Sequence, residues 1–404
     1  MSSRSFAVTG VRVFDGDAVI ERATVLVDGE TITGVAAAAD VTGREVVDGA
    51  GATLIPGLID CHAHPTGDAL ALAMLFGVTT EIDMFTTPER LGTQRERAAK
   101  HNDLADIRSA STGATVLGGH PSMLIGLSFR EQFPVVTGEE DAAQFVRDRI
   151  AEGADFIKLL IDDGTAGGHP SPTLTGAMAK AVVAEAHRHG LMAVAHATSA
   201  ANAVEAVQAG ADGLAHVFMD QPPTPEVIAV IKEAGIFVIP TLVTMGSMAG
   251  DLTGAAVAED ERARRYIPED WRGNLCQCWQ FGSPSSLANA QRATAALHEA
   301  GVPILAGTDA ADVGVLGTAH GASLHQELAQ LVECGLSPIE ALAAATSRAA
   351  SAWRLDDRGR IAPGLQADLV LIDGDPTTDI TDSLSIRAVW RRGELLERTP
   401  KETA

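Results

Sequence analysis

The sequence predicts an α/β protein composed of a (β/α)8 TIM barrel and a small β-sandwich domain to which both ends of the chain contribute. Three observations lead to this expectation. Short apolar runs alternate with amphipathic stretches through the middle of the chain, both ends read as short strands, and His, Lys and Asp follow several of the central runs. A doubly wound open sheet is the structural alternative, but polar residues at the C-terminal ends of several different strands are typical of a barrel active site.

The two ends of the chain supply the small domain. Strand patterns interrupted by Gly and Asp cover residues 6–14, 24–28 and 32–36 near the start, and 367–372 and 386–390 near the end. Neither end is long enough to bury a core by itself. We therefore expect residues 1–58 and 359–404 to form one β-sandwich domain together.

The catalytic barrel is expected over residues 59–358. Its candidate strands are apolar runs at residues 54–59, 78–85, 115–117, 156–161, 191–195, 213–217, 236–240 and 303–306. Amphipathic helical stretches lie between them, at residues 175–189, 200–209, 225–234, 287–300 and 320–334. Residues 243–281 read as the longest irregular connection, and a loop of that length is usually functional or disordered.

Composition excludes several classes of function. The 404 residues include 30 Lys+Arg and 53 Asp+Glu, and the net charge of −23 argues against binding to nucleic acid or anionic lipid. No apolar run approaches the roughly 18 residues that span a bilayer, and the first residues carry no apolar signal core. Four cysteines make no disulfide framework in so long a chain. We expect a cytoplasmic protein that acts on a small molecule, with no nucleic acid or membrane partner.

Two histidines at the first barrel strand give the clearest chemical signal. Residues two apart on a strand face the same way, so His62 and His64 point together into the barrel mouth, where paired imidazoles suit a divalent metal. Lys158 lies within an apolar strand run, and burying an unpaired ammonium is costly. It either pairs with Asp162 or Asp163, reaches the rim, or reacts with CO2 to become a carboxylate-like ligand.

Three further residues complete the candidate set. His196 and His216 each end an apolar run on consecutive candidate strands, and Asp309 follows the last run. Taken singly, each is as well explained as a core histidine or a helix N-cap. Six such residues at strand ends of one barrel favour a shared metal site over coincidence.

Together these motifs closely resemble the amidohydrolase superfamily. The likeness spans nearly the whole chain and rests on the segments VTGVRVFDG, IPGLIDCHAHP, GADFIKLL, AVAHATS, GLAHV, AGTDA, ALAAATSRAA and GRIAPGLQADLVLIDGDP. Within the superfamily, the chain looks like the imidazolonepropionase-like and Xaa-Pro-dipeptidase-like subgroup. The resemblance also raises the expectation of a homo-oligomer.

The resemblance implies two divalent metal ions, usually zinc, although histidine and carboxylate sites accept other metals. In the resembled arrangement the more buried ion is bound by His62, His64 and Asp309, and the more exposed ion by His196 and His216. Lys158, N-carboxylated, bridges them. A metal-bridging hydroxide would attack the carbonyl of an amide, peptide-like or cyclic amide C–N bond, with Asp309 as the proton shuttle.

Three further residues are candidates for contacts with the substrate. His120 matches a GGH histidine that contacts the substrate in the resembled subgroup. His169, in the loop after the Lys158 strand, could donate to the substrate from the barrel mouth, and Arg130 could bind a substrate carboxylate. Each is also explained as an ordinary loop residue.

The sequence leaves three alternatives to an amidohydrolase. The first is a hydrolase of a lactone, carbamate, ester or phosphoester at the same site. The second is a deaminase of an aminated heterocycle; related deaminases carry a glutamate three residues after the fifth-strand histidine, where this chain has Ser199. The third is a non-enzyme, which would need a broken metal set, whereas all six residues are present.

Overall fold

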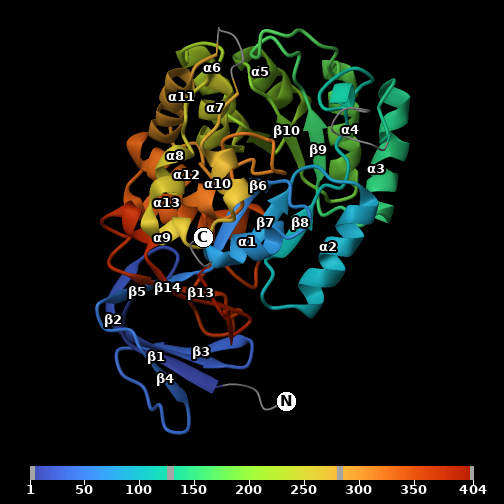
Figure 1. The fold of residues 1–404 in the computed structure, drawn as a ribbon. Helices are drawn as coiled ribbons and strands as arrows, with labels where there is room; N and C mark the ends of the chain where they lie inside the picture. The colour runs from blue at the N-terminus through green and yellow to red at the C-terminus, as the bar shows by residue number, and fades with distance from the viewer. Residues whose placement is uncertain (1–4, 125–131, 280–284, 401–404) are drawn as a thin grey trace.

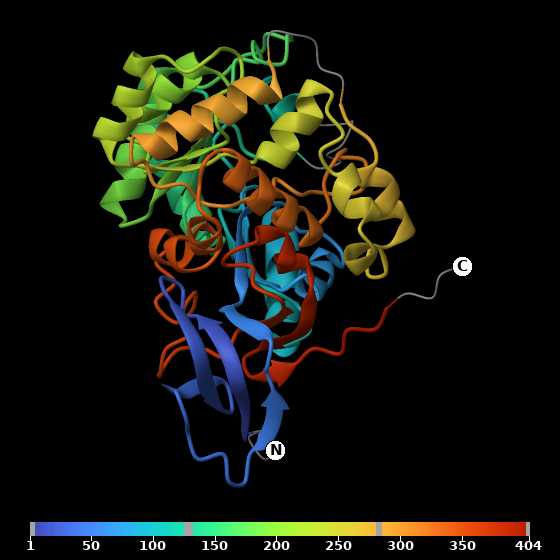
Figure 2. The same ribbon diagram turned by 90° about the vertical axis from the view of Figure 1, so that its left-hand side faces the viewer.

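The computed structural model describes residues 5–124, 132–279 and 285–400. Within these ranges, no helix is both long enough and apolar enough to cross a membrane. Figures 1 and 2 show strands flanked by helices in the upper part of the molecule, with a smaller β-rich part packed beneath it. The fold class is the (β/α)8 barrel with a small β-sandwich that the sequence predicts.

Both ends of the chain meet in one sheet at the bottom of Figure 1. Its order is β15-β14-β13-β5-β1-β2-β3, with β4 beside β1. The strands from the start of the chain are β1 (Ser5–Phe14), β2 (Val19–Asp28), β3 (Thr31–Ala36), β4 (Glu45–Asp48) and β5 (Ala52–Pro56). Those from the end are β13 (Leu369–Asp373), β14 (Ile386–Arg391) and β15 (Glu394–Leu395).

Pairing between the two ends holds this sheet together. Strands β5 and β13 run antiparallel, with Leu54 opposite Leu371. The rings of Phe6 and Trp390 stack with centroids 5.4 Å apart, one ring from each end of the chain. The domain boundaries at 58/59 and 358/359 stay a prediction.

The barrel strands form two parallel groups. The first contains β6 (Leu58–Ala63), β7 (Val78–Asp83) and β8 (Asp106–Ser109), and the second contains β9 (Ile157–Leu160), β10 (Ala193–His196), β11 (Gly213–Ala215) and β12 (Phe237–Ile239). The bridge between Ala114 and Leu159 joins the groups on one side. On the other, Leu305 N–H donates to the Val238 carbonyl at 2.9 Å and the Ala306 carbonyl accepts from Cys61 N–H at 2.9 Å. Residues 303–306 therefore take the eighth position and complete the ring.

Helices cover the outside of the ring. They are α1 (Ala69–Leu75), α2 (Pro88–Lys100), α3 (Ala142–Ala151), α4 (Gly176–Arg188), α5 (Ala200–Ala209), α6 (Pro225–Ala234), α11 (Leu287–Glu299), α12 (Ala322–Glu333), α13 (Pro338–Ala344) and α14 (Ser347–Ala352). Several begin at a side chain that accepts a backbone N–H of the first turn, as at Thr175, Ser199 and Ser337. The helices expected from the sequence correspond to α4, α5, α6, α11 and α12. Short 3-10 turns lie at Ser122–Leu124, Glu139–Asp141 and Ile380–Leu384.

The first and third predicted barrel strands are corrected by the structure. The run at 54–59 splits at Gly57, where the chain leaves the small sheet and enters the barrel. A Cβ on Gly57 would lie 2.2 Å from Thr79 Oγ1, so a larger residue does not fit there. The third strand is β8 rather than residues 115–117. It was missed because Ile107 alone provides an apolar side chain in Asp-Ile-Arg-Ser.

Residues 243–281 are not the irregular connection that the sequence suggested. The described part holds α7 (Leu242–Ala249), α8 (Ala255–Glu259), α9 (Glu261–Arg264) and α10 (Glu269–Leu275). These helices are short and interrupted by glycines, and α7 is buried along most of its length, so no amphipathic period marks them.

Aromatic packing closes the N-terminal end of the barrel. Trp353, which follows α14, lies with its ring 4.7 Å from Phe156 and 5.6 Å from Phe237. These rings belong to a buried cluster with residues from most of the barrel strands. A substrate must therefore reach the barrel interior from the opposite end, where the polar strand ends lie.

Candidate active site

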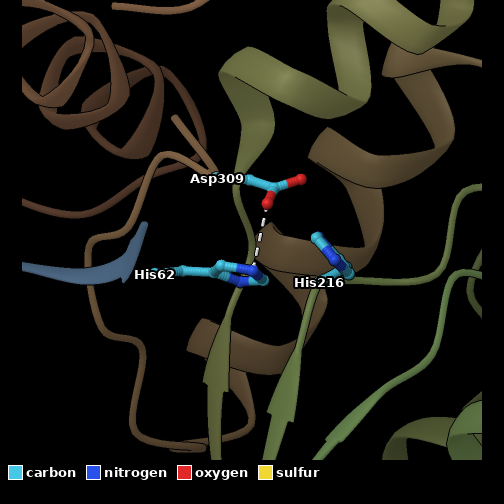
Figure 3. Close-up of side chains that lie close together, drawn as sticks. All are labelled: His62, His216 and Asp309. Atoms are coloured by element: carbon cyan, nitrogen blue, oxygen red, sulfur yellow. Dashed lines mark ion pairs between the residues drawn. The ribbon is translucent and has the colours of Figure 1, made fainter. Parts of the chain in front are cut away.

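Five of the six predicted residues lie at or just after the C-terminal ends of barrel strands, whereas Lys158 is the second residue of β9. The strands contribute them in chain order, with His62 and His64 at β6, Lys158 on β9, His196 at the end of β10, His216 after β11 and Asp309 after residues 303–306. Figure 3 shows His62, His216 and Asp309 pointing toward one another. One ligand atom from each of these three lies within 4.8 Å of the others, close enough to hold a metal ion.

His62 and His64 converge on one carboxylate oxygen. Their Nε2 atoms each lie 3.1 Å from Asp309 Oδ1. Nδ1 of His64 is 3.1 Å from the Phe85 carbonyl, which can only accept, so Nδ1 carries a proton. Nε2 faces the carboxylate, where a second proton or a metal ion satisfies both groups. Two imidazole nitrogens and a carboxylate oxygen that meet at one point are a donor set that fits a metal.

Proton affinities in this group reflect burial and charge. Burial lowers the pKa of His62 to about 3, which keeps its ring neutral. Burial alone would raise the pKa of Asp309, but the His62 ring and the hydrogen bonds from both histidines outweigh it and hold that pKa well below its usual range. Burial lowers the pKa of His64, but its hydrogen bond to Asp309 outweighs burial and raises that pKa above the usual value. A metal ion at this point would displace the proton from His64, because histidine ligands bind metal as neutral imidazoles.

His196 and His216 form a second converging pair. His216 Nε2 lies 2.9 Å from His196 Nδ1. The Thr241 hydroxyl donates to the Pro240 carbonyl at 2.7 Å, so it accepts from His216 Nδ1 at 2.7 Å. His196 in turn donates Nε2–H to Asp162 at 2.8 Å. If both rings are neutral, the two facing nitrogens present lone pairs, and either a shared proton or a metal ion between them satisfies both.

Lys158 is buried without a hydrogen-bond partner. Its side chain is 2% exposed, and Nζ has no partner among the described residues. Burial lowers its pKa to about 7, although Asp309 and Asp83 act in the opposite direction. Pairing with Asp162, an alternative left open by the sequence, does not occur, because that carboxylate binds His196. A neutral, nucleophilic amine in this position is the form that reacts with CO2.

Three residues at the strand ends adopt left-handed backbone conformations. The φ angles are 85° at His216, 53° at Thr241 and 59° at Asp309. Such conformations cost non-glycine residues about 1–3 kcal/mol each and concentrate at functional sites. The surrounding hydrogen bonds must therefore hold these residues in place.

Asp60 provides part of this support, and sequence reasoning missed it. Its fully buried carboxylate accepts the His62 N–H at 3.1 Å and the Thr308 N–H at 3.0 Å, and the Thr308 hydroxyl donates to it at 2.6 Å. One carboxylate thus fixes the backbones of both segments that carry the His62–Asp309 pair. Its place in the Asp-Cys-His sequence was a signal, but its partners lie far along the chain.

Asp162 was also missed as a member of the site. Burial raises its pKa, but the hydrogen bond from His196 outweighs burial and keeps that pKa well below the usual range. Gly164 N–H donates to the other carboxylate oxygen at 2.8 Å, and the Thr198 hydroxyl donates at 3.1 Å. Such partners orient a histidine ligand and select its tautomer.

If His196 binds a metal ion, replacing Asp162 with asparagine is expected to weaken that binding by about 10–100-fold, because the amide can turn its NH2 group to His196 and reverse the tautomer. Zinc affinity is measured by competition with a chelating indicator. Asp163→Asn is the matched control, since its carboxylate bonds only the neighbouring Thr165 in the described structure. Equal zinc affinity in both variants would contradict the assigned role of Asp162.

The predicted substrate-binding residues differ in position. The His120 ring stacks on His196 with centroids 4.8 Å apart, so it borders the site. Burial lowers its pKa to about 3. His169 is exposed on the loop after β9, and its side chain makes no hydrogen bond or ring contact with the described residues. Arg130 lies outside the described residues.

Ser199 has a structural role where related deaminases carry a glutamate. It begins α5, and its hydroxyl oxygen accepts Asn202 N–H at 3.1 Å. No carboxylate is therefore supplied at this position.

The sequence matches the pattern of the family described as "Amidohydrolase family" over residues 53–396. An ochratoxinase from Aspergillus niger is 27% identical over 274 residues, which cover 65% of this chain and 50% of that protein, so the chain spans about half the length of this relative. An imidazolonepropionase from Deinococcus deserti is 43% identical over 63 residues, which are 15% of this chain and 16% of that protein.

Solved structures share the whole fold. A Xaa-Pro dipeptidase with methionine bound in its active site superposes with a TM-score of 0.77 at 24% identity, and the match covers 97% of this chain and 100% of that one. At this identity, the likeness establishes the fold alone.

Proposed function

The chain belongs to the amidohydrolase family, and from this we propose that it is a metal-dependent hydrolase of a C–N bond in an amide, peptide-like or cyclic amide substrate. The observation that carries the proposal is that histidine nitrogens face one another or a carboxylate at two points of the strand ends. One lies between His62, His64 and Asp309, and the other between His196 and His216. Their number favours two ions over one.

The proposed ligand sets follow from these two groups. His62, His64 and Asp309 would hold one divalent ion, and His196 and His216 the other, with zinc the ion that imidazole ligands favour. N-carboxylated Lys158 would contribute to both, since its unpartnered amine lies in the same barrel mouth. Bound ions would supply an acidified water and polarise the scissile carbonyl.

The chain's own residues would carry the proton. Asp309 holds an ionised carboxylate beside two imidazoles, and its second oxygen is free of the contact with His62 and His64. We assign it to accept a proton from the attacking water and return it to the departing nitrogen. An amide nitrogen is a poor leaving group unless it is protonated, so the proton transfer from Asp309 to that nitrogen matters most for turnover. His120, stacked beside His196, is placed to contact the substrate.

Metal removal followed by a substrate panel tests the proposal. Metal-stripped protein is expected to be inactive, and zinc or cobalt restores turnover of N-acyl amino acids, dipeptides or cyclic amides at two ions per chain. Cleavage of esters or lactones without amides would contradict C–N specificity, and ammonia release from aminated heterocycles would favour a deaminase. Fewer than two ions in the active enzyme would exclude the binuclear arrangement.

A further inference from the structure

Glu327 is a fully buried carboxylate to which the proposed reaction gives no part. It lies on α12, and its side chain is not exposed to solvent. Oε1 accepts the Leu242 N–H at 3.0 Å and Oε2 accepts the Val243 N–H at 3.0 Å. Both donors belong to the first turn of α7, so a side chain from another helix caps this one.

Helix α7 needs this external cap because its own N-cap side chain is engaged elsewhere. Thr241 precedes the helix in a left-handed conformation and makes no capping hydrogen bond with its side chain. Its hydroxyl instead donates to the Pro240 carbonyl and accepts from His216. Unpaired N–H groups at a buried helix start are costly, and a carboxylate there also meets the positive end of the helix dipole.

The first turn of α7 contacts both halves of the candidate site. Thr241 bonds His216 Nδ1 at 2.7 Å, and the Thr244 hydroxyl donates to the Thr308 carbonyl at 2.8 Å, next to Asp309. Thr241 and His216 both keep strained φ angles, of 53° and 85°. Any shift of this turn would therefore move the hydroxyl that orients the His216 ring.

We propose that Glu327 is a positioning residue for His216. By fixing the first turn of α7, it holds the Thr241 hydroxyl where His216 must donate Nδ1–H and turn Nε2 toward His196. This inference rests on the proposed role of His216 as a metal ligand. Glu327 contacts no ligand residue directly and acts through the backbone of Leu242 and Val243.

Cobalt binding separates positioning from simple helix capping. Co2+ is titrated into the metal-stripped full chain against a chelating indicator, and its visible absorption and the thermal midpoint are recorded. The variants are Glu327→Gln, Thr241→Val, Thr241→Ser and the Glu327→Gln/Thr241→Val double variant. Glu340→Gln is the matched control, because Glu340 caps α13 through the Ser337 N–H at 2.9 Å and neither residue belongs to the site.

If Glu327 positions His216, Glu327→Gln and Thr241→Val should each lower the affinity for one of the two bound Co2+ ions by about 10–100-fold. The visible absorption of that ion should change as well. Thr241→Ser keeps the hydroxyl and retains parental affinity. The double variant loses no more than the stronger single variant, because both changes break one chain of contacts. Glu340→Gln lowers the thermal midpoint and leaves both ions bound.

The inference would be overturned if Glu327→Gln bound Co2+ with the parental affinity. It would also be overturned if the affinity loss of the double variant equalled the product of the two single losses. If Glu327→Gln does not fold, Glu327→Asp keeps the carboxyl group, shortens the reach and is judged by the same two outcomes. A parent chain that binds no Co2+ is visible before any variant is compared. That result would overturn the proposed metal-dependent function itself, and this inference with it.

Discussion

Asp309→Asn should retain the fold and lose about 10²–10⁴-fold in kcat/KM, the range attributed to a positioned proton-transfer group. An asparagine amide cannot accept a proton, and its NH2 group would face a histidine Nε2 that now lies 3.1 Å from a carboxylate oxygen. The fold should persist because the segment is held by backbone bonds, including Asp309 N–H to the His62 carbonyl at 2.7 Å. Steady-state kinetics on the best amide substrate, with thermal unfolding alongside, measure both expectations.

Asp312→Asn is the control for this change. Asp312 lies on the same loop but is exposed, so its substitution should leave kcat within about twofold of the parent, as surface changes away from special features generally do. Full activity in Asp309→Asn would show that another group moves the proton. Equal losses in the two variants would point to a general disturbance of the loop.

The residues that could be identified from sequence are those whose local setting is already unusual. His62 and His64 alternate along a strand, and Lys158 interrupts an apolar run, so each is visible without its partners. The structure brings all six predicted residues to one end of the barrel. Their roles as ligands stay a proposal, but their convergence could be expected from strand direction alone.

The residues that could not be identified act through distant partners. Asp60 reaches Thr308, Asp162 reaches His196, and Glu327 reaches the start of α7. Each is an acidic residue in an acidic chain, and its neighbours in sequence do not reveal the distant partner that it binds. Only tertiary contacts give these carboxylates their function, and a single sequence does not contain those contacts.

The missed barrel strand has a similar cause. Strand β8 carries Asp106 and Arg108 on one face, and these charges form ion pairs at the junction with the small domain. Arg358 donates to Asp106 at 2.7 Å while almost fully buried. A strand that faces a neighbouring domain with charged residues has no apolar run, so hydrophobicity alone favoured residues 115–117 instead.

Lys158→Met should abolish turnover and, in the metal-stripped protein, raise the free energy of unfolding by about 1–4 kcal/mol, as replacing buried charged groups by apolar ones often does. Methionine has nearly the same shape but removes the unpartnered Nζ. It also removes the amine that carboxylation requires. A variant that loses turnover but gains stability would show that Lys158 serves the reaction and not the stability of the fold.

The pH dependence of the free energy of unfolding shows whether the buried Lys158 amine is what lowers the stability of the parent. In the unfolded chain, Lys158 holds its proton up to the ordinary pKa of 10.5, whereas burial lowers the folded pKa to about 7. Between these values the unfolded state binds more protons, so the stability of the metal-stripped parent should rise with pH across this window. Urea unfolding of the metal-stripped proteins at several pH values measures the slope, and Lys158→Met should lack this contribution.

Lys180→Met provides the matched comparison, because Lys180 is exposed on α4 and its substitution should change neither the slope nor the activity.

Carboxylation of Lys158 adds one further requirement. Metal-stripped parent prepared without CO2 should regain full turnover only when bicarbonate accompanies the metal, and faster above pH 7, where the Lys158 amine is neutral. Full recovery with metal alone in CO2-free buffer would mean that Lys158 serves the site as an amine. A Lys158→Met protein less stable than the parent would mean that its amine is paired.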